Sequence, residues 1–190
     1  MPKVRVDNLE IQYDVVNRDI GFPRLEFRTG RLAVILPKGK DAKEIVEKHK
    51  TWIGKKHAEI IKATAKSKEK SLDLSRTVQD FKISSLRRVK LVSEKHGFSA
   101  KSVYFRKMKS KWASHSSNGN LTINTYLRFL PERLINYVIF HELVHSVERR
   151  HNERFWRIVE KGFKNHLKLE NELMIYWFII QENIPKNELT

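Results

Sequence analysis

The sequence predicts an α+β fold, because strand-like alternation fills its first part and helical periodicity fills most of the remainder. Its 190 residues favour one domain with room for a small second one. With 40% hydrophobic and 10% aromatic residues, the chain can form a packed core. We therefore expect a globular protein in which a small N-terminal β-rich and helical subdomain precedes a larger domain.

The N-terminal subdomain is expected to span residues 1–66. Three segments alternate apolar and polar side chains as strands do: 9–16, 24–29 and 31–36. The last two are separated by Thr29 and Gly30, which predicts a hairpin turn. Apolar residues recur at helical spacing among lysines over 41–66, and this pattern predicts one or two amphipathic helices.

The second domain is expected to span residues 76–190. The connection at 66–75 is polar and lacks aromatic residues, so the boundary is placed there, with one continuous domain as the alternative. The expected elements are a helix over 77–96 stopped by Gly97, strands at 102–105 and 121–124, a helix starting at Pro131, a helix starting near Asn152, and an apolar helix around 173–180.

The charge balance and the absence of cysteine narrow the functional classes. Lys and Arg number 38 against 22 Asp and Glu, so the surface should attract polyanions. Because the chain has no cysteine, any metal must be held by His or carboxylate. The N-terminus lacks the apolar core of a signal peptide, and the apolar run 174–180 is too short to span a membrane. These features predict a cytoplasmic protein without a membrane anchor, and the run 174–180 is expected either to be buried or to form an interface with a partner.

An HExxH motif, His141 to His145, lies in the helix predicted after Pro131. Residues four apart share a face of an α-helix, so both imidazoles can bind one ion. Glu142 lies beside them and can accept a proton from a water molecule activated by the metal. The motif therefore predicts a metal-dependent hydrolase.

A catalytic zinc site needs a third protein ligand, for which His151 is the candidate. The chain must turn after the helix to bring this residue back toward His145. Glu148 and Glu153 are rival ligands, and a surface histidine that caps the next helix is the other interpretation of His151. Glu148 stands where metzincins, with the pattern HExxHxxGxxH, have glycine, and this difference argues against that class.

The stretch 108–156 resembles the YgjP-like metallopeptidase family, a relative of the SprT-like and WLM zinc proteases. Its matching positions are Lys109, Ser110, Trp112, Ser114, Gly119, Asn120, Asn124, the helix 137–145, His151, Phe155 and Trp156. Ala113 and His115 stand where the family has Gly and Cys, and no proposed ligand is lost. Weaker similarity extends to most of 24–160. The resemblance implies a zincin-like metallopeptidase domain that holds zinc, one ion per chain, and cleaves a peptide or protein substrate.

The resemblance also implies that the strand at 121–124 borders the cleft, where an extended peptide could pair with its edge. Asn124 could then orient the substrate, unless it only ends an ordinary strand. His115 could contact substrate or act as an alternative ligand, or it could be a loop histidine without such a role.

A basic stretch, 82–111, has ten Lys and Arg residues and one acid. It is either a solvated face or a nucleic-acid contact, and the candidate contacts are Arg87, Arg88, Lys107, Lys109 and Lys111. Three functions are therefore open: a metallopeptidase, a metal-dependent hydrolase of nucleotides or other phosphoanhydrides, and a nucleic-acid-binding module with a structural zinc site.

Overall fold

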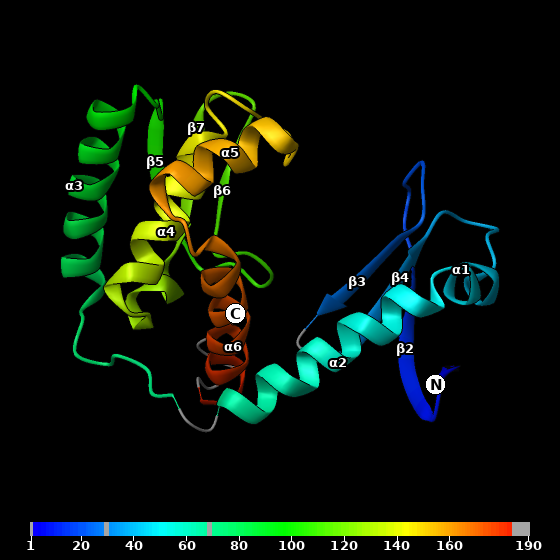
Figure 1. Ribbon diagram of the computed structural model, residues 1–190. Helices are drawn as coiled ribbons and strands as arrows, with labels where there is room; N and C mark the ends of the chain where they lie inside the picture. Colours follow the sequence, from blue (N-terminus) through cyan, green and yellow to red (C-terminus); the bar gives the residue numbers. More distant parts are fainter. Residues whose placement is uncertain (1, 29–30, 68–69, 184–190) are drawn as a thin grey trace. The chain divides into compact units, whose positions relative to one another are not determined.

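The computed structural model describes residues 2–28, 31–67 and 70–183, and the chain divides into two compact units, 1–69 and 70–190. The first unit contains β1 (Lys3–Val6), β2 (Leu9–Asn17), β3 (Arg24–Arg28), β4 (Arg31–Leu36), α1 (Ala42–Lys48) and α2 (Lys50–Ser67) (Figure 1). The second contains α3 (Val78–His96), β5 (Ser102–Arg106), β6 (Ala113–His115), β7 (Asn120–Asn124), the 3-10 helix η1 (Thr125–Phe129), α4 (Glu132–Val144), α5 (Glu153–Gly162) and α6 (His166–Asn183). Each unit combines helices with its own sheet, so the predicted α+β class is confirmed.

The sheet of the first unit has the strand order β1-β2-β4-β3. β3 and β4 pair antiparallel, as the alternating segments predicted, whereas β2 and β4 run parallel. The predicted turn residues Thr29 and Gly30 lie outside the described residues. The core of this unit combines strand and helix side chains, among them Val4, Ile11, Leu32, Val34, Val46 and Ile53. Alternate strand residues point to this core because the side-chain period of a strand is two.

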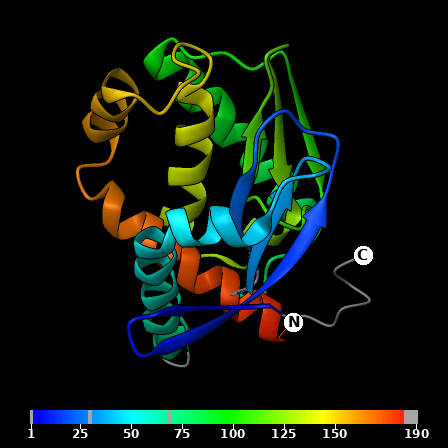
Figure 2. The same cartoon turned by 90° about the vertical axis from the view of Figure 1, so that its right-hand side faces the viewer.

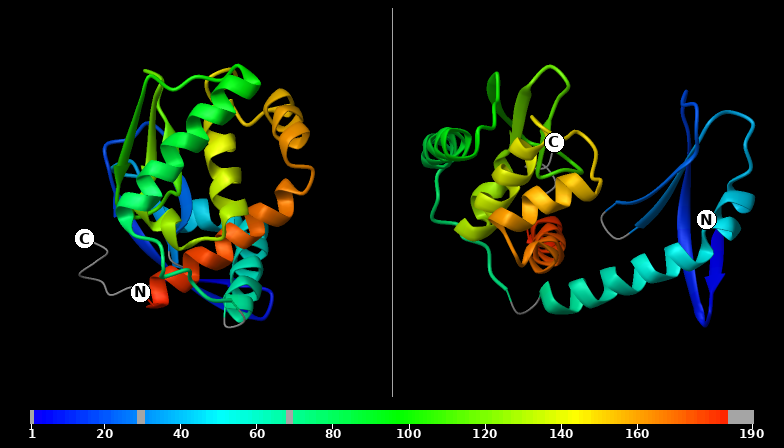
Figure 3. Two further views of the ribbon diagram at one scale, coloured as in Figure 1. Left: turned by 90° about the vertical axis from the view of Figure 1, so that its left-hand side faces the viewer. Right: turned by 45° about the horizontal axis from the view of Figure 1, so that its top comes forward.

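The sheet of the second unit has the strand order β5-β7-β6, with β5 parallel and β6 antiparallel to β7. α3 packs on β5, where the rings of Phe81 and Phe105 meet edge to face at 6.0 Å. α4 contacts β6 and β7. Figures 2 and 3 show both helices on the same side of this sheet. The helix with the HExxH motif thus packs against both the sheet and α3.

α3 ends at the glycine that its sequence predicted and begins after a threonine cap. Thr77 caps its N-terminus, since the Thr77 hydroxyl accepts a hydrogen bond from the backbone N–H of Asp80 at 3.1 Å. Gly97 ends it in a left-handed conformation with φ of 68°, which glycine adopts without strain. α3 therefore begins and ends close to the predicted bounds.

α4 is buried on most of its surface, because it contacts the sheet, α3, α5 and α6. Its buried apolar residues are Leu134, Ile135, Tyr137, Val138, Ile139, Phe140, Leu143 and Val144. A helix that is apolar on nearly all sides is stable only inside a core. His141 and Glu142 are partly exposed, so they lie where this core opens.

α6 includes the apolar run 174–180 and begins earlier than predicted, at His166. Ile175, Tyr176, Ile179 and Ile180 are buried in the fold, which gives the run a place in the protein's own core. Within the described ranges, no helix combines the length and the apolar composition that crossing a bilayer requires.

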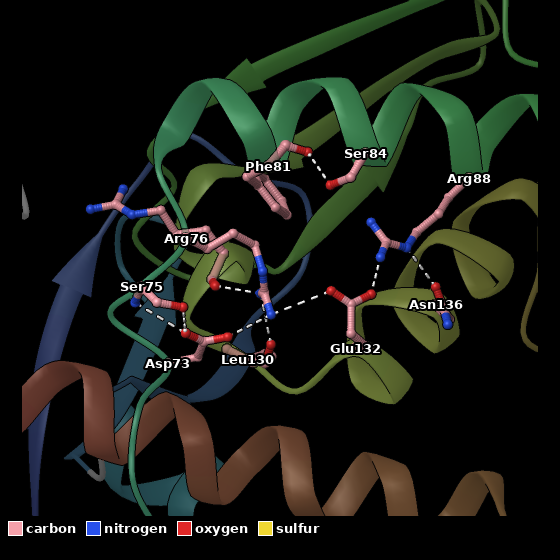
Figure 4. Close-up of polar contacts among 10 residues, drawn as sticks. Asp73, Ser75, Arg76, Phe81, Ser84, Arg88, Leu130, Glu132 and Asn136 are labelled. Carbon is pink, nitrogen blue, oxygen red and sulfur yellow. Dashed lines mark hydrogen bonds and ion pairs between the residues drawn. The ribbon is translucent and has the colours of Figure 1, made fainter.

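A charged network anchors the start of α4 (Figure 4). Arg76, which precedes α3, donates to the carbonyl of Leu130 at 3.0 Å and pairs with Glu132 at 3.3 Å. Arg88 from α3 pairs with the same Glu132 carboxylate and donates to Asn136 at 2.8 Å. Planar guanidinium groups can serve several acceptors at once, so two arginines tie α3 to the first turns of α4.

The packing of α4 on α5 depends on Gly162. A Cβ atom added there would lie 2.6 Å from Cζ of the Phe140 ring, which is closer than any normal contact. Phe140 is buried, so its ring has little room to move. We therefore expect Gly162→Ala to destabilise the protein by about 1–3 kcal/mol, even though alanine favours helix. Urea unfolding measures this, with Gly21→Ala as the control because its Cβ would meet nothing within 4 Å. A Gly162→Ala variant as stable as the wild type would contradict the prediction.

Candidate metal centre

α4 brings His141 and His145 onto one side of the helix. Their ring centroids are 5.5 Å apart, as the spacing of four residues predicted. The helix ends at Val144, and His145 occupies the cap position with φ of −64° and ψ of −12°. Both histidines are partly buried, so a ligand bound between them would be partly shielded from water.

His151 reaches the same point after the chain has turned back. α5 begins directly beyond it, capped by Asn152, whose side-chain oxygen accepts from the backbone N–H of Phe155 at 3.0 Å. Nε2 of His151 lies 3.1 Å from Nε2 of His141. One ligand atom from each of the three histidines lies within 4.8 Å of the others. The structure therefore brings His141, His145 and His151 together.

The geometry of this cluster fits a tetrahedral zinc ion. Two imidazole nitrogens bound to zinc at about 2.0–2.1 Å would lie roughly 3.3 Å from each other. The separation of 3.1 Å between His141 and His151 is close to that value. A third nitrogen within 4.8 Å needs only a small movement to complete the set. Three imidazoles leave a fourth position open, as catalytic zinc sites require.

An aromatic wall holds the three imidazoles. The ring of Phe155 lies 4.9 Å from that of His141, 4.8 Å from that of His145 and 4.5 Å from that of His151. Trp156 stacks on His151 at 5.6 Å with an interplanar angle of 28°. Because these rings restrict the rotamers of the histidines, the cluster is held in place before any ion binds.

The backbone determines which nitrogen of His145 faces the centre. Its Nδ1 lies 3.1 Å from the carbonyl oxygen of Glu148, an acceptor, so Nδ1 carries the proton and Nε2 is free to bind a metal. The rival ligands are engaged elsewhere. The Glu148 carboxylate accepts from the backbone N–H of Arg150 at 3.2 Å, and Glu153 pairs with Arg157 at 3.2 Å.

Burial shapes the protonation of His141 and Glu142. It lowers the pKa of His141 to about 3, with further lowering from His151 and His145. The ring is therefore neutral at pH 7, which is the form that binds metals. Burial also raises the pKa of Glu142 to about 7, against the lowering effects of the backbone N–H of His115 and the charge of Lys111. Such a carboxyl group can exchange a proton near neutral pH.

A pocket of about 350 Å³ opens over the cluster. Its lining comes from four parts of the chain: β6 with the preceding Lys111 and Trp112, α4, His151, and Glu170 and Leu173 of α6. Sequence reasoning missed Glu170, because no local pattern connects it with His141 and His145, which lie on an earlier helix. Tyr137, which also lines the pocket, could have been found because it lies one helical turn before His141.

The strand beside the pocket is β6, not the strand predicted from the sequence. β7 lies between β5 and β6, so the expectation that residues 121–124 border the cleft is wrong. Asn124 is fully buried, and its amide nitrogen donates to the carbonyls of Met108 at 2.9 Å and Lys111 at 2.7 Å. Its side-chain oxygen accepts from the backbone N–H of Tyr126 at 3.1 Å. Asn124 therefore holds the loop before β6 and does not line the pocket.

His115 does line the pocket, at the end of β6. Its backbone N–H donates to the carboxylate of Glu142, and this contact lowers the pKa of Glu142. Nε2 of its ring lies 3.1 Å from the carbonyl oxygen of Ser99, outside the group of converging metal donors. His115 therefore offers a backbone donor to Glu142 and contributes its side chain to the pocket lining.

The predicted nucleic-acid contacts occupy different environments. Arg88 pairs with Glu132 and Asn136, so its guanidinium group is committed to the fold. The other four are exposed: Arg87 on α3, and Lys107, Lys109 and Lys111 in the loop between β5 and β6. Lys111 also lines the pocket. Nucleic-acid binding by these residues stays a prediction.

Comparisons with known proteins give a family match over the second unit of the chain. The family model described as YgjP-like, metallopeptidase domain, matches residues 75–175, more than half of the chain. The chain is similar to the metallopeptidase zymogen abylysin of Pyrococcus abyssi, with 26% identity, a TM-score of 0.44, and coverage of 47% of this chain and 91% of that one. It is also similar to the metallopeptidase zymogen jannalysin of Methanocaldococcus jannaschii, with 27% identity, a TM-score of 0.42, and coverage of 53% and 97%. No curated protein matches the chain.

Proposed function

Because the chain belongs to the YgjP-like metallopeptidase family, we propose that it cleaves peptide bonds with one zinc ion per chain. The proposed ligands are His141, His145 and His151, and the proposed general base is Glu142. The observation that carries the proposal is the convergence of three imidazole nitrogens within 4.8 Å, in the lining of a pocket that Glu142 also lines. We further propose that 76–190 is the catalytic domain and that 1–66 is accessory to it.

The donor set favours zinc over other metals. Neutral imidazoles without thiolates suit zinc among the abundant divalent cations, and oxygen-rich sites suit magnesium and calcium. When bound, zinc lowers the pKa of a coordinated water to about 7 and polarises a carbonyl group as a Lewis acid. The phenylalanine and tryptophan rings beside the histidines support a fixed coordination geometry, because they limit how far the imidazoles can turn.

Glu142 handles the proton of the reaction. As a carboxylate it takes a proton from the attacking water, and as a carboxylic acid it returns that proton to the leaving amine. The backbone N–H of His115 contacts the Glu142 carboxylate, and this contact keeps the carboxylate turned toward the pocket. Lys111, whose charge favours the ionised carboxylate, supports the basic form before the reaction.

β6 supplies a place for the substrate. In the described part of the chain its one partner strand is β7, and the residues of β6 line the pocket. A peptide that pairs with this edge would run past Glu142 and the three histidines, with its backbone held by main-chain hydrogen bonds. The role that the sequence suggested for Asn124 is thus assigned to Ala113–His115.

Metal analysis and substrate assays test the proposal. Protein purified without a histidine tag should contain about one zinc per chain, and His141→Ala should lose it because a ligand is removed. The zinc-loaded wild type should cleave casein, and a chelator should stop the cleavage. Release of phosphate from nucleoside triphosphates without peptide cleavage would instead support a phosphoanhydride hydrolase. A folded protein that binds no zinc would contradict both the metallopeptidase and the phosphoanhydride hydrolase.

A further inference from the structure

Next to Nδ1 of His141 lies the carboxylate of Glu170, which the proposed reaction does not use. Oε1 of Glu170, on α6, is 3.6 Å from Nδ1 of His141. That Nδ1 atom is buried and has no hydrogen-bond partner among the described residues. The distance exceeds a hydrogen bond by roughly 0.5 Å, which a small side-chain rotation can close. The Glu170 carboxylate and Nδ1 of His141 therefore face one another at slightly more than hydrogen-bond distance.

Tyr137 holds the Glu170 carboxylate in place by a hydrogen bond. Its hydroxyl donates to the same Oε1 atom of Glu170 at 2.5 Å, and its ring meets His141 edge to face at 5.9 Å. Tyr137 is buried one helical turn before His141, so its position is determined by the core. Burial also raises the pKa of Tyr137, so its hydroxyl stays protonated and remains a donor. Glu170 is thus held by a rigid neighbour of the histidine it faces.

His145 and His141 differ in what lies behind them. The carbonyl of Glu148 satisfies Nδ1 of His145. His141 lies inside α4, where backbone carbonyls serve the helix itself, so its partner has to come from another element. Metal-binding histidines almost always donate their second ring N–H to a carboxylate, carbonyl or water. The acceptor that the fold offers to His141 is Glu170.

We propose that Glu170 is the positioning residue of His141. Its carboxylate accepts the Nδ1 proton of His141, which directs Nε2 toward the metal and increases its strength as a ligand, while Tyr137 holds the carboxylate. This inference rests on the proposed function, because it takes His141 to be a metal ligand. Glu170 is not itself a ligand, since the converging donors are the three histidines.

The zinc dissociation constant, measured by competition with a chromophoric chelator, tests the inference. Glu170→Ala should raise the constant about 10–100-fold, the usual effect of removing such a partner. Glu170→Gln, which keeps an acceptor oxygen but no charge, should fall between Glu170→Ala and the wild type. Tyr137→Phe should have a smaller effect in the same direction. The proton on Nδ1 of His141, followed by NMR in the zinc-loaded protein, should be protected from exchange in the wild type and lose that protection in Glu170→Ala.

Glu172→Gln is the matched control. It removes the same charge from the same helix, but Glu172 faces Arg133. The zinc affinity of Glu172→Gln should equal that of the wild type. Equal affinity in Glu170→Ala and the wild type, or equal losses in Glu170→Gln and Glu172→Gln, would overturn the inference and leave the proposed function intact. A wild type that binds no zinc would instead overturn the proposed function itself.

Discussion

Glu142→Gln should lower kcat for peptide cleavage about 10³-fold while the bound zinc is retained. Glutamine has nearly the same shape as glutamate but cannot take a proton from water, so general base and acid catalysis are lost together. The zinc content should not change, because the three histidines are intact. Initial rates on casein or a fluorogenic peptide, combined with metal analysis of the same sample, measure both quantities.

Glu153→Gln provides the control for this experiment. Glu153 is an exposed carboxylate in the first turn of α5, close in sequence to the ligands, but it pairs with Arg157. Its kcat should stay within about twofold of the wild type, because exposed ion pairs contribute little. A Glu142→Gln variant that keeps more than a tenth of the wild-type rate would remove Glu142 from the role of general base.

The local part of the site could be predicted from the sequence. The geometry of an α-helix determines that His141 and His145 share a face and that Glu142 lies beside them, so spacing alone was sufficient. The apolar residues around the motif predicted a buried helix, and α4 is buried. His151 was also within reach of prediction, because it lies only a few residues beyond the helix and the chain there is polar enough to turn.

The parts of the site that depend on tertiary packing could not be predicted. β6 is three residues long, Ala-Ser-His, too short to show alternation, yet it forms one wall of the pocket. Glu170 reaches His141 only because α6 packs on α4. The two interpretations of Asn124 could not be distinguished for a related reason. A buried asparagine that serves backbone carbonyls has the same sequence signature as one that serves a substrate, and only the burial distinguishes them.

His151→Ala should raise the zinc dissociation constant by about 10² or more and abolish activity at limiting zinc. Structural zinc sites with four ligands bind with about 10–16 kcal/mol in all, so one ligand contributes on the order of 3 kcal/mol, or roughly a hundredfold. The side chain of His151 is exposed, so its removal should cost little packing. Without zinc, the unfolding temperature of His151→Ala should therefore stay near that of the wild type. The rise in unfolding temperature on adding zinc should be smaller in the variant than in the wild type.

His115→Ala tests whether His115, and not His151, is the third metal ligand. His115 lines the same pocket, but its ring nitrogen faces the carbonyl oxygen of Ser99, so zinc affinity should not change in this variant. Its backbone N–H, the group that contacts Glu142, is kept after the substitution. If His115→Ala loses zinc and His151→Ala keeps it, the third ligand lies on β6, and the turn between α4 and α5 serves the fold alone. If both keep it, the rival Glu148 becomes the next residue to replace, because the Glu153→Gln control already tests the other rival. The affinities of these two single variants therefore distinguish the two candidate histidines, because among the described residues His115 and His151 line the pocket beside the pair on α4.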